Sequence, residues 1–270
     1  MFDQVYLSEI QDPYVNLSLE QRLLEELVPN ERRLLIYINQ PCVVIGRFQN
    51  PLQECDLSFM KEQGIDWIRR QSGGGTVYHD LGNINLCFLN GARELQKADH
   101  QEYLVKVLRQ FDFHAKISGR SDVLVEYKGL DYKISGSAFK QKRDRSFHHA
   151  TLLYDADKAA LKKCLAPKLK IQNSRSIPSN PHPTINLKQI TPQLELSQLM
   201  TGLTQGHTVQ NLDAKTVLSM VSTDYLQSLK TWEWKWGEIP VFDLHHEGQV
   251  ISFQKAQTVD GIKINEFLGL

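Results

Sequence analysis

Three successive glycines, Gly73, Gly74 and Gly75, stand between two segments in which apolar and polar residues alternate. The alternation over residues 65–69 and 84–88 predicts two half-buried strands. A loop without Cβ atoms lets backbone amides come close to a bound anion or carboxylate. The segment therefore predicts a rigid loop between two strands that is suited to holding an anion.

Polar side chains flank these glycines. Two arginines precede them, and the following residues add several hydrogen-bonding groups: Tyr78, His79, Asp80, Asn83 and Asn85. Guanidinium groups would supply charge and directional donors to an anionic ligand. A glycine run alone is also typical of a bare turn. A P-loop would need Gly-Lys-Ser/Thr opening a helix, and a dinucleotide fold would need spaced glycines before one; both are disfavoured.

Residues 69–85, RRQSGGGTVYHDLGNIN, match without a gap the characteristic loop of the lipoate–protein ligase and lipoyltransferase family, which the chain resembles. A second family motif appears as KISGSAF at residues 133–139, and a third as FHHATLL at 147–153. The likeness extends from about Pro13 to Trp236. Three motifs in the family's order are far more specific than one.

The resemblance implies an α+β fold with a mixed sheet flanked by helices, as in the catalytic domains of biotin ligases and class II synthetases. It implies a catalytic domain over residues 1–240 and a short C-terminal extension over 241–270, the remnant of an accessory domain. Family members that act alone usually continue through a whole accessory domain after this point.

The resemblance also implies a reaction. Lipoate would be activated with ATP and Mg²⁺ to lipoyl-AMP, and the lipoyl group would pass to a lysine of an acceptor. The acceptors would be lipoyl domains of the E2 subunits of 2-oxoacid dehydrogenases and the glycine cleavage H protein. Lys133 would be the catalytic residue, and Asp122 would face the reacting phosphate and its metal ion.

Two further sets of residues follow from the motifs. The resemblance assigns ATP and lipoyl-AMP binding to Arg70, Gly75, Thr76, Val77, Tyr78, Asp122, Lys133, Ser135, Gly136 and Ala138. It assigns the lipoate pocket to Ser72, Gly73, Gly74, His79 and His149.

Alternative roles stay open for single residues. A strand lysine such as Lys133 is usually only a solubilising charge, although the small residues after it leave room for a ligand beside its ammonium. Asp122 could instead pair with Arg120 or cap a turn. His148 and His149 are not expected to be metal ligands, because adjacent strand residues face opposite sides and only one of them can join the site. His149 could also be a hydrogen-bonded core histidine.

Three departures from the family pattern leave other activities open. Ser121 replaces the usual asparagine, Asn180 stands where the mobile covering loop usually has an arginine, and the C-terminal extension is short. The chain could be a lipoyltransferase that uses preformed lipoyl-AMP or another acyl donor, a ligase that needs a separate accessory subunit, or a non-catalytic binding module. Thioester-dependent octanoyl transfer is disfavoured because it needs a nucleophilic cysteine, and none lies in the motifs.

Composition excludes other classes of function. The 31 basic residues balance the 31 acidic ones, so net charge points neither to nucleic acid nor to a membrane surface. No segment approaches a membrane span, and the N-terminus has no signal or transit pattern. The four cysteines form no C-x-x-C pair, which argues against a zinc site and gives no disulfide framework. We expect a soluble, cytoplasmic protein.

Periodicity predicts the remaining elements. Helices are expected over residues 16–28, 100–111, 155–166, 194–203 and 214–229. Further strands are expected over residues 34–38, 42–46 and 132–138 and in the Trp-x-Trp-x-Trp segment 232–236, with a hairpin at Glu247 and Gly248.

Overall fold

The computed structural model describes residues 2–94, 96–119, 122–253, 258–259 and 262–270. The chain forms two compact units, each assembled from three separate segments. Unit 1 comprises Met1–Gln40, Asp80–Ala156 and Pro181–Val221. Unit 2 comprises Pro41–His79, Asp157–Asn180 and Ser222–Leu270.

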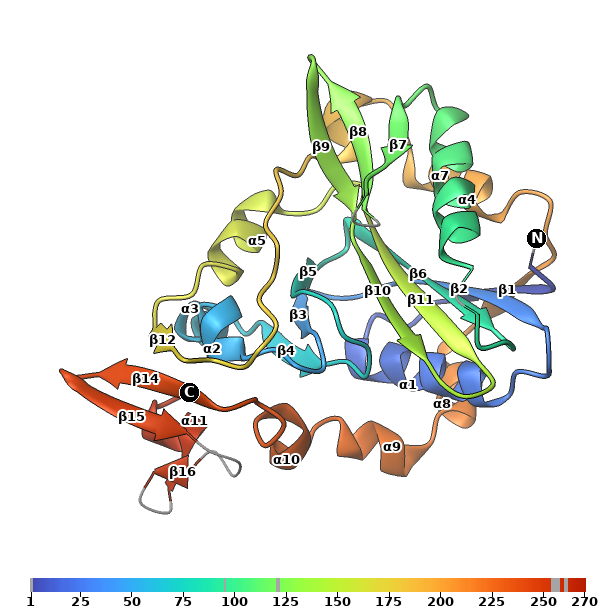
Figure 1. Ribbon diagram of the computed structural model, residues 1–270. Helices are drawn as coiled ribbons and strands as arrows, with labels where there is room; N and C mark the ends of the chain where they lie inside the picture. Colours follow the sequence, from blue (N-terminus) through green and yellow to red (C-terminus); the bar gives the residue numbers. More distant parts are fainter. Residues whose placement is uncertain (1, 95, 120–121, 254–257, 260–261) are drawn as a thin grey trace. The chain divides into compact units, whose positions relative to one another are not determined.

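Unit 1 is built on a six-stranded mixed sheet with the order β10-β11-β6-β2-β1-β13 (Figure 1). Its strands are β1 (Gln4–Ser8), β2 (Arg32–Ile38), β6 (Asn83–Asn90), β10 (Ser137–Gln141), β11 (Ser146–Leu153) and β13 (Val209–Leu212). Strand β1 pairs in parallel with β2 and β13, whereas β2, β6, β11 and β10 pair antiparallel in turn.

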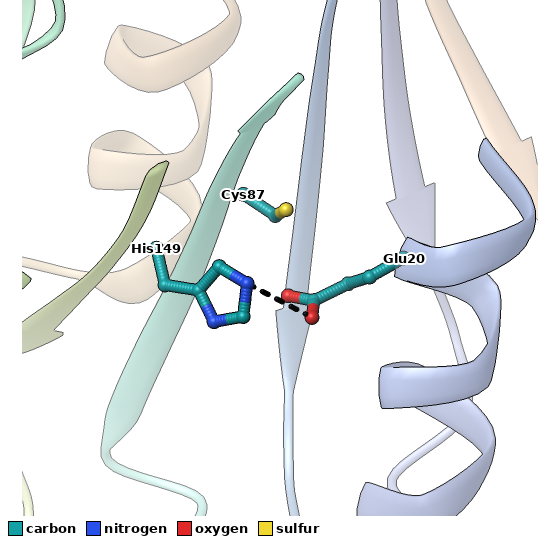
Figure 2. Close-up of side chains that lie close together, drawn as sticks. All are labelled: Glu20, Cys87 and His149. Atoms are coloured by element: carbon teal, nitrogen blue, oxygen red, sulfur yellow. Dashed lines mark ion pairs between the residues drawn. The ribbon is translucent and has the colours of Figure 1, made fainter. Parts of the chain in front are cut away.

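The two faces of this sheet carry different side chains because successive strand residues point to opposite sides. On β6, Ile84, Leu86 and Phe88 join the main apolar core, to which α4 contributes Leu104 and Leu108. Cys87 points the other way, toward α1 (Figure 2). The helices of unit 1 are α1 (Pro13–Glu25), α4 (Lys97–Arg109), α6 (Leu187–Ile190), α7 (Leu196–Thr204) and α8 (Ala214–Met220).

A second sheet of unit 1 contains β7 (Ala115–Ile117), β8 (Val123–Tyr127) and β9 (Leu130–Ser135) in antiparallel order. The single strand predicted over 132–138 is therefore wrong: it breaks at Gly136 into β9 and β10, which belong to different sheets. The break occurs where Gly136 exchanges hydrogen bonds with Thr151 of β11, its amide donating to the hydroxyl and its carbonyl accepting from the Thr151 amide, both at 3.1 Å.

In the part of unit 2 that the structure describes, there are two three-stranded sheets and one pair of short strands. One sheet has the order β4-β3-β5, from β3 (Cys42–Ile45), β4 (Asp66–Arg69) and β5 (Val77–His79). The other has the order β12-β14-β15, from β12 (Lys170–Gln172), β14 (Phe242–His246) and β15 (Gln249–Phe253). Strands β16 (Thr258–Val259) and β17 (Ile262–Lys263) pair antiparallel. The helices are α2 (Pro51–Glu54), α3 (Leu57–Glu62), α5 (Lys158–Cys164), α9 (Thr223–Ser228), α10 (Trp232–Lys235) and α11 (Ile264–Phe267).

The strand predicted to lead into the glycine loop is present as β4. The strand predicted over 84–88 is present as β6, but β5 precedes it, and β6 is buried along its whole length rather than half-buried. The hairpin at Glu247 and Gly248 is present, and both residues have positive φ. The two strands around residues 39–41 exist as β2 and β3 but lie in different sheets. Helix α1 begins at Pro13, three residues before its predicted start, because Asp12 caps it by accepting from two backbone amides. The helix predicted over 214–229 divides into α8 and α9, with Ser222 capping the second.

The strand predicted for the tryptophan segment is wrong. Residues 232–235 form helix α10, capped by the Thr231 hydroxyl, which accepts from the Trp234 amide. In a helix, Trp232 and Trp236 share a face, and both belong to the apolar core of unit 2. Trp232 and Trp236 are four residues apart, and residues at this spacing share a face in a strand as well as in a helix. The tryptophan spacing alone therefore does not distinguish a strand from a helix. Among the described residues, no helix has the length and apolar character needed to cross a membrane.

Candidate functional site

Lys133 of β9 forms an ion pair with Asp122, with 2.9 Å between Nζ and a carboxylate oxygen. Asp122 directly precedes β8, the strand that pairs with β9. Both side chains are largely buried, with 24% and 15% of their surfaces exposed. Unit 1 thus brings together the predicted catalytic lysine and the predicted phosphate-facing aspartate, 11 positions apart in the sequence. Arg120 and Ser121, named in the predictions, lie outside the described residues.

The backbone of Lys133 is fixed on both sides. It pairs with Leu124 of β8 and forms an isolated bridge to Thr184, its amide donating to the Pro183 carbonyl at 2.8 Å. Gly136 makes room for its side chain: a Cβ there would lie 3.1 Å from Lys133 Cε and 3.2 Å from Nζ. The absence of a side chain at Gly136 therefore leaves the space that the Lys133 ammonium occupies.

Two other residues of the second motif have clear environments. The Ser135 hydroxyl is buried and has no hydrogen-bond partner among the described residues. Ala138 is buried on β10 and pairs with His149 of β11. These contacts keep the motif close to β11.

The adjacent histidines face opposite sides of β11, as predicted. His148 is fully buried on the core side, where its Nε2 lies 2.9 Å from the Ser137 hydroxyl and its Nδ1 lies 3.3 Å from His100. Burial lowers the pKa of His148 well below its usual value. His149 lies on the other face, with Nε2 3.3 Å from a Glu20 carboxylate oxygen.

In unit 2, Arg70 organises the glycine loop from inside. Its guanidinium donates to the carbonyls of Gly73 and Gly75, at 2.6 and 2.7 Å, and to the carbonyl of Val44. Its Nε donates to the Ser72 hydroxyl, which is itself fully buried. Arg70 therefore fixes the loop by gathering its carbonyls.

Gly74 needs to be a glycine because its φ is 86°. Its carbonyl also packs against Gly46, where an added Cβ would lie 2.1 Å from the Gly74 oxygen. Gly73 is different, because a Cβ there would meet nothing within 4 Å. Gly74 is therefore required by its backbone angle, and Gly46 by the close approach of the Gly74 carbonyl.

Ser179, from the segment that resembles the family's covering loop, lies on the glycine loop. Its hydroxyl accepts from the Thr76 amide at 2.8 Å and lies within 3.0 Å of the place where a Gly75 Cβ would be. Gln49 also donates to this hydroxyl and accepts from the Thr76 hydroxyl. One backbone amide predicted to hold a phosphate therefore already donates to an oxygen of the chain.

The remaining predicted residues of unit 2 lie on β5, which pairs with β3. Val77 is half-buried and Tyr78 is buried. Burial, with a smaller effect of the nearby Arg70 charge, lowers the pKa of His79 to about 3. His79 is therefore a neutral imidazole at physiological pH.

The four cysteines are buried free thiols. Burial raises the pKa of Cys55, Cys87 and Cys164, to about 11 for Cys164. A protonated, buried thiol is a poor nucleophile, so these three residues are unsuited to thioester chemistry.

Two residues that contact predicted site residues were not predicted from the sequence: Glu20, which contacts His149, and Ser179, which contacts Thr76. Glu20 of helix α1 is 5% exposed and accepts from the Tyr37 hydroxyl at 2.9 Å. Ser179 lies in the irregular segment between β12 and α6, which gave no periodic signal in the sequence. Glu20 could have been found from the sequence, because it is an acidic residue among the apolar residues that helix α1 buries.

A model of the lipoyl protein ligase A/B catalytic domain matches residues 12–208. Among solved structures, the chain is similar to P. falciparum LipL1 in complex with lipoate, with 28% identity, a TM-score of 0.74, and coverage of 92% of this chain and 84% of that one.

Two other solved structures share the fold. A bipartite lipoate protein ligase with its E2 lipoyl domain from Thermoplasma acidophilum has 20% identity, a TM-score of 0.72, and coverage of 88% and 98%. An ATP-bound lipoate-protein ligase A has 22% identity, a TM-score of 0.70, and coverage of 87% and 98%. The predicted mixed-sheet α+β fold is thereby confirmed.

Proposed function

The chain belongs to the lipoyl protein ligase A/B catalytic-domain family, and from that premise we propose that it activates lipoate with ATP to lipoyl-AMP. It then transfers the lipoyl group to a lysine of a lipoyl domain or of the glycine cleavage H protein. Membership of this family supports a lipoate-ligase type of enzyme. The AMP-forming step, the acceptors and the residues that act are the proposal.

The Lys133–Asp122 pair is the observation that carries it. An ammonium held at 2.9 Å from one carboxylate, in a largely buried position, is a fixed positive charge with hydrogen-bond donors to spare. Lys133 would neutralise the lipoate carboxylate and the α-phosphate while they approach, and would stabilise the charge that develops as pyrophosphate leaves. Such charge stabilisation acts on both the activation and the transfer step.

The other residues would bind and orient. We assign the phosphate to backbone amides around Gly75 and Thr76, and the adenylate to Arg70, Val77, Tyr78, Ser135, Gly136 and Ala138. The buried Ser135 hydroxyl has a donor to offer, which supports its place among these residues. We assign lipoate to Ser72, Gly73, Gly74, His79 and His149. A neutral His79 would donate or accept a hydrogen bond without adding charge.

Asp122 fits a magnesium-bound phosphate. Mg²⁺ commonly binds through one or two carboxylates together with substrate phosphates and water, and Asp122 offers one carboxylate oxygen beside Lys133. The chemistry that the ion supplies when bound is screening of phosphate charge. Lys133 and Asp122 hold their positions through β8 and β9.

The decisive assay mixes the purified chain with lipoate, ATP, magnesium and an unmodified lipoyl domain, and follows the mass of the domain and the release of pyrophosphate. We expect both. Lipoylation from synthetic lipoyl-AMP without pyrophosphate release from ATP would instead identify a transferase, which the Asn180 departure favours. Stoichiometric lipoate binding without turnover would identify a binding module.

Lys133→Ala should lower both half-reactions by at least about 100-fold, as removal of a charge that acts in the transition state commonly does. Lys133→Arg should restore little, because a planar fork does not replace a point charge. Lys116→Ala is the matched control: Lys116 lies in the same three-stranded sheet and pairs with Asp131 at 2.8 Å, but is half exposed. Parental activity in Lys133→Ala would refute the assignment.

A further inference from the structure

A second cluster of reactive side chains lies on the α1 side of the large sheet of unit 1. Cys87 of β6 and His149 of β11 are directly paired across the two strands. Glu20 reaches them from helix α1 (Figure 2). Three different elements therefore deliver a thiol, an imidazole and a carboxylate to one point.

The distances suit a single small cation. One ligand atom from each residue lies within 4.8 Å of the other two. The His149 Nε2 and a Glu20 oxygen are 3.3 Å apart. Zinc–ligand bonds of roughly 2.1 Å in a tetrahedron place two ligand atoms about 3.4 Å apart, so this pair already has the required separation. The Cys87 sulfur lies within 4.8 Å of both of these atoms.

The surroundings would orient the donors. Glu20 and Cys87 are buried and His149 is half-buried. The Tyr37 hydroxyl donates to one Glu20 oxygen at 2.9 Å, which turns the other oxygen toward His149. The Phe147 ring stacks on the imidazole, with 4.5 Å between ring centres. Hydrogen bonds and packing of this kind hold metal ligands in place.

Charge also favours a divalent ion. A glutamate carboxylate and a cysteine thiolate together carry two negative charges, and a neutral imidazole adds none. A dication bound by these three would be neutralised locally, which limits the cost of burying it. Sulfur and nitrogen donors together select zinc over magnesium or calcium.

We propose that Glu20, Cys87 and His149 form a binding site for one Zn²⁺ ion, with a fourth coordination position open. On binding, the Cys87 S–H bond breaks, its proton passes to solvent, and a Zn–S bond forms.

The site has a consequence that rests on the proposed function. His149 is assigned there to the lipoate pocket, so zinc on its Nε2 and lipoate would compete. Zinc would then inhibit lipoylation by lowering the affinity for lipoate. The cluster would link acyl binding to the supply of a thiol-binding metal.

The test uses the purified full chain under reducing conditions, treated with a chelator, dialysed, and titrated with Co²⁺, a spectroscopic substitute for zinc. We expect one equivalent to bind with a thiolate-to-cobalt charge-transfer absorption, and Zn²⁺ to abolish it. The titration needs no ATP, lipoate or acceptor, so its result is independent of the ligase activity.

Cys87→Ser should remove the charge-transfer absorption. Glu20→Gln, which keeps the thiol and the shape of the side chain, should retain the absorption but weaken binding by at least about 100-fold. Cys164→Ser, which removes a buried thiol of unit 2, is the matched control and should bind as the parent does. Circular dichroism checks the fold of each variant.

Two results would overturn the site: no charge-transfer absorption in the parent chain, or an undiminished one in folded Cys87→Ser. Lipoate should raise the apparent dissociation constant for Co²⁺. Cobalt binding that follows the variants as expected but is indifferent to lipoate would uphold the metal site and refute the assignment of His149 to the lipoate pocket.

Discussion

Replacing Gly136 by alanine should slow lipoylation by moving Lys133 while leaving the fold intact. The added Cβ would lie 3.1 Å from Lys133 Cε and 3.2 Å from Nζ, whereas ordinary contacts begin at about 3.4 Å. The flexible lysine must therefore shift by at least a few tenths of an ångström. Gly136 lies outside the left-handed region, so its backbone accepts alanine.

The size of the effect follows from the geometry. Misplacing a reacting group by about 1 Å costs roughly 100-fold in rate, so a shift of a few tenths should cost about 10-fold, or about 1.4 kcal/mol in the barrier. Stability should not fall. Losing the conformational freedom of glycine in the unfolded chain should raise the free energy of unfolding by up to about 1 kcal/mol.

The assay is a double-mutant cycle of lipoylation rates with Gly136→Ala and Lys133→Ala, together with urea unfolding of each variant. Because the alanine acts through the lysine, Gly136→Ala should cost nothing further once Lys133 is an alanine. Equal losses in both backgrounds, or an unchanged rate in the single variant, would show that Gly136 does not act by placing the ammonium.

Three further measurements test other parts of the structure. Ser179→Ala removes an internal acceptor from the Thr76 amide, so KM for ATP should fall about 5-fold, equivalent to one hydrogen bond of about 1 kcal/mol; an unchanged or higher KM in initial-rate kinetics would contradict this. Gly46→Ala forces a Cβ onto the Gly74 carbonyl and should lower the free energy of unfolding by about 1–3 kcal/mol in urea, whereas an unchanged midpoint would show that the loop yields freely. Burial lowers the pKa of His100 to about 4, below the value of about 6.5 in the unfolded chain. The neutral His100 therefore contributes fully to the free energy of unfolding above pH 6.5, and this contribution is lost as the pH falls toward 4. At pH 5 the free energy of unfolding should be lower by about 2 kcal/mol, and His100→Gln should flatten its dependence on pH in urea unfolding.

The histidine pair shows how far local rules extend. Alternation along a strand correctly placed His148 and His149 on opposite faces, because it follows from covalent geometry alone. It could not say which face holds the core. That depends on α4 packing on one side of β6 and β11, and α1 on the other.

The motifs of the chain predicted the fold class and identified Lys133 and Asp122 as candidate site residues, since their sequences resemble a family whose fold is shared. That these two side chains form an ion pair was shown only by the structure. They could not show that Gly136 ends one strand and begins another, because the break depends on hydrogen bonds to Thr151 of a separate strand. The tryptophan segment failed for a related reason. Over five residues, the strand period of two and the helix period of 3.6 both place Trp232 and Trp236 on one face. Packing of these side chains in the apolar core of unit 2 selects the helix.

Cysteine spacing argued against a zinc site, but spacing along the sequence detects only ligands that lie close together in the chain. Glu20, Cys87 and His149 come from a helix and two strands that are far apart in the chain. The sequence by itself determined the local periods, the turns that need glycine, and the resemblance that identifies the family. Only the tertiary structure decided which side chains meet, because a donor set assembled from separate elements exists only after the sheet has paired and its helices have packed against it.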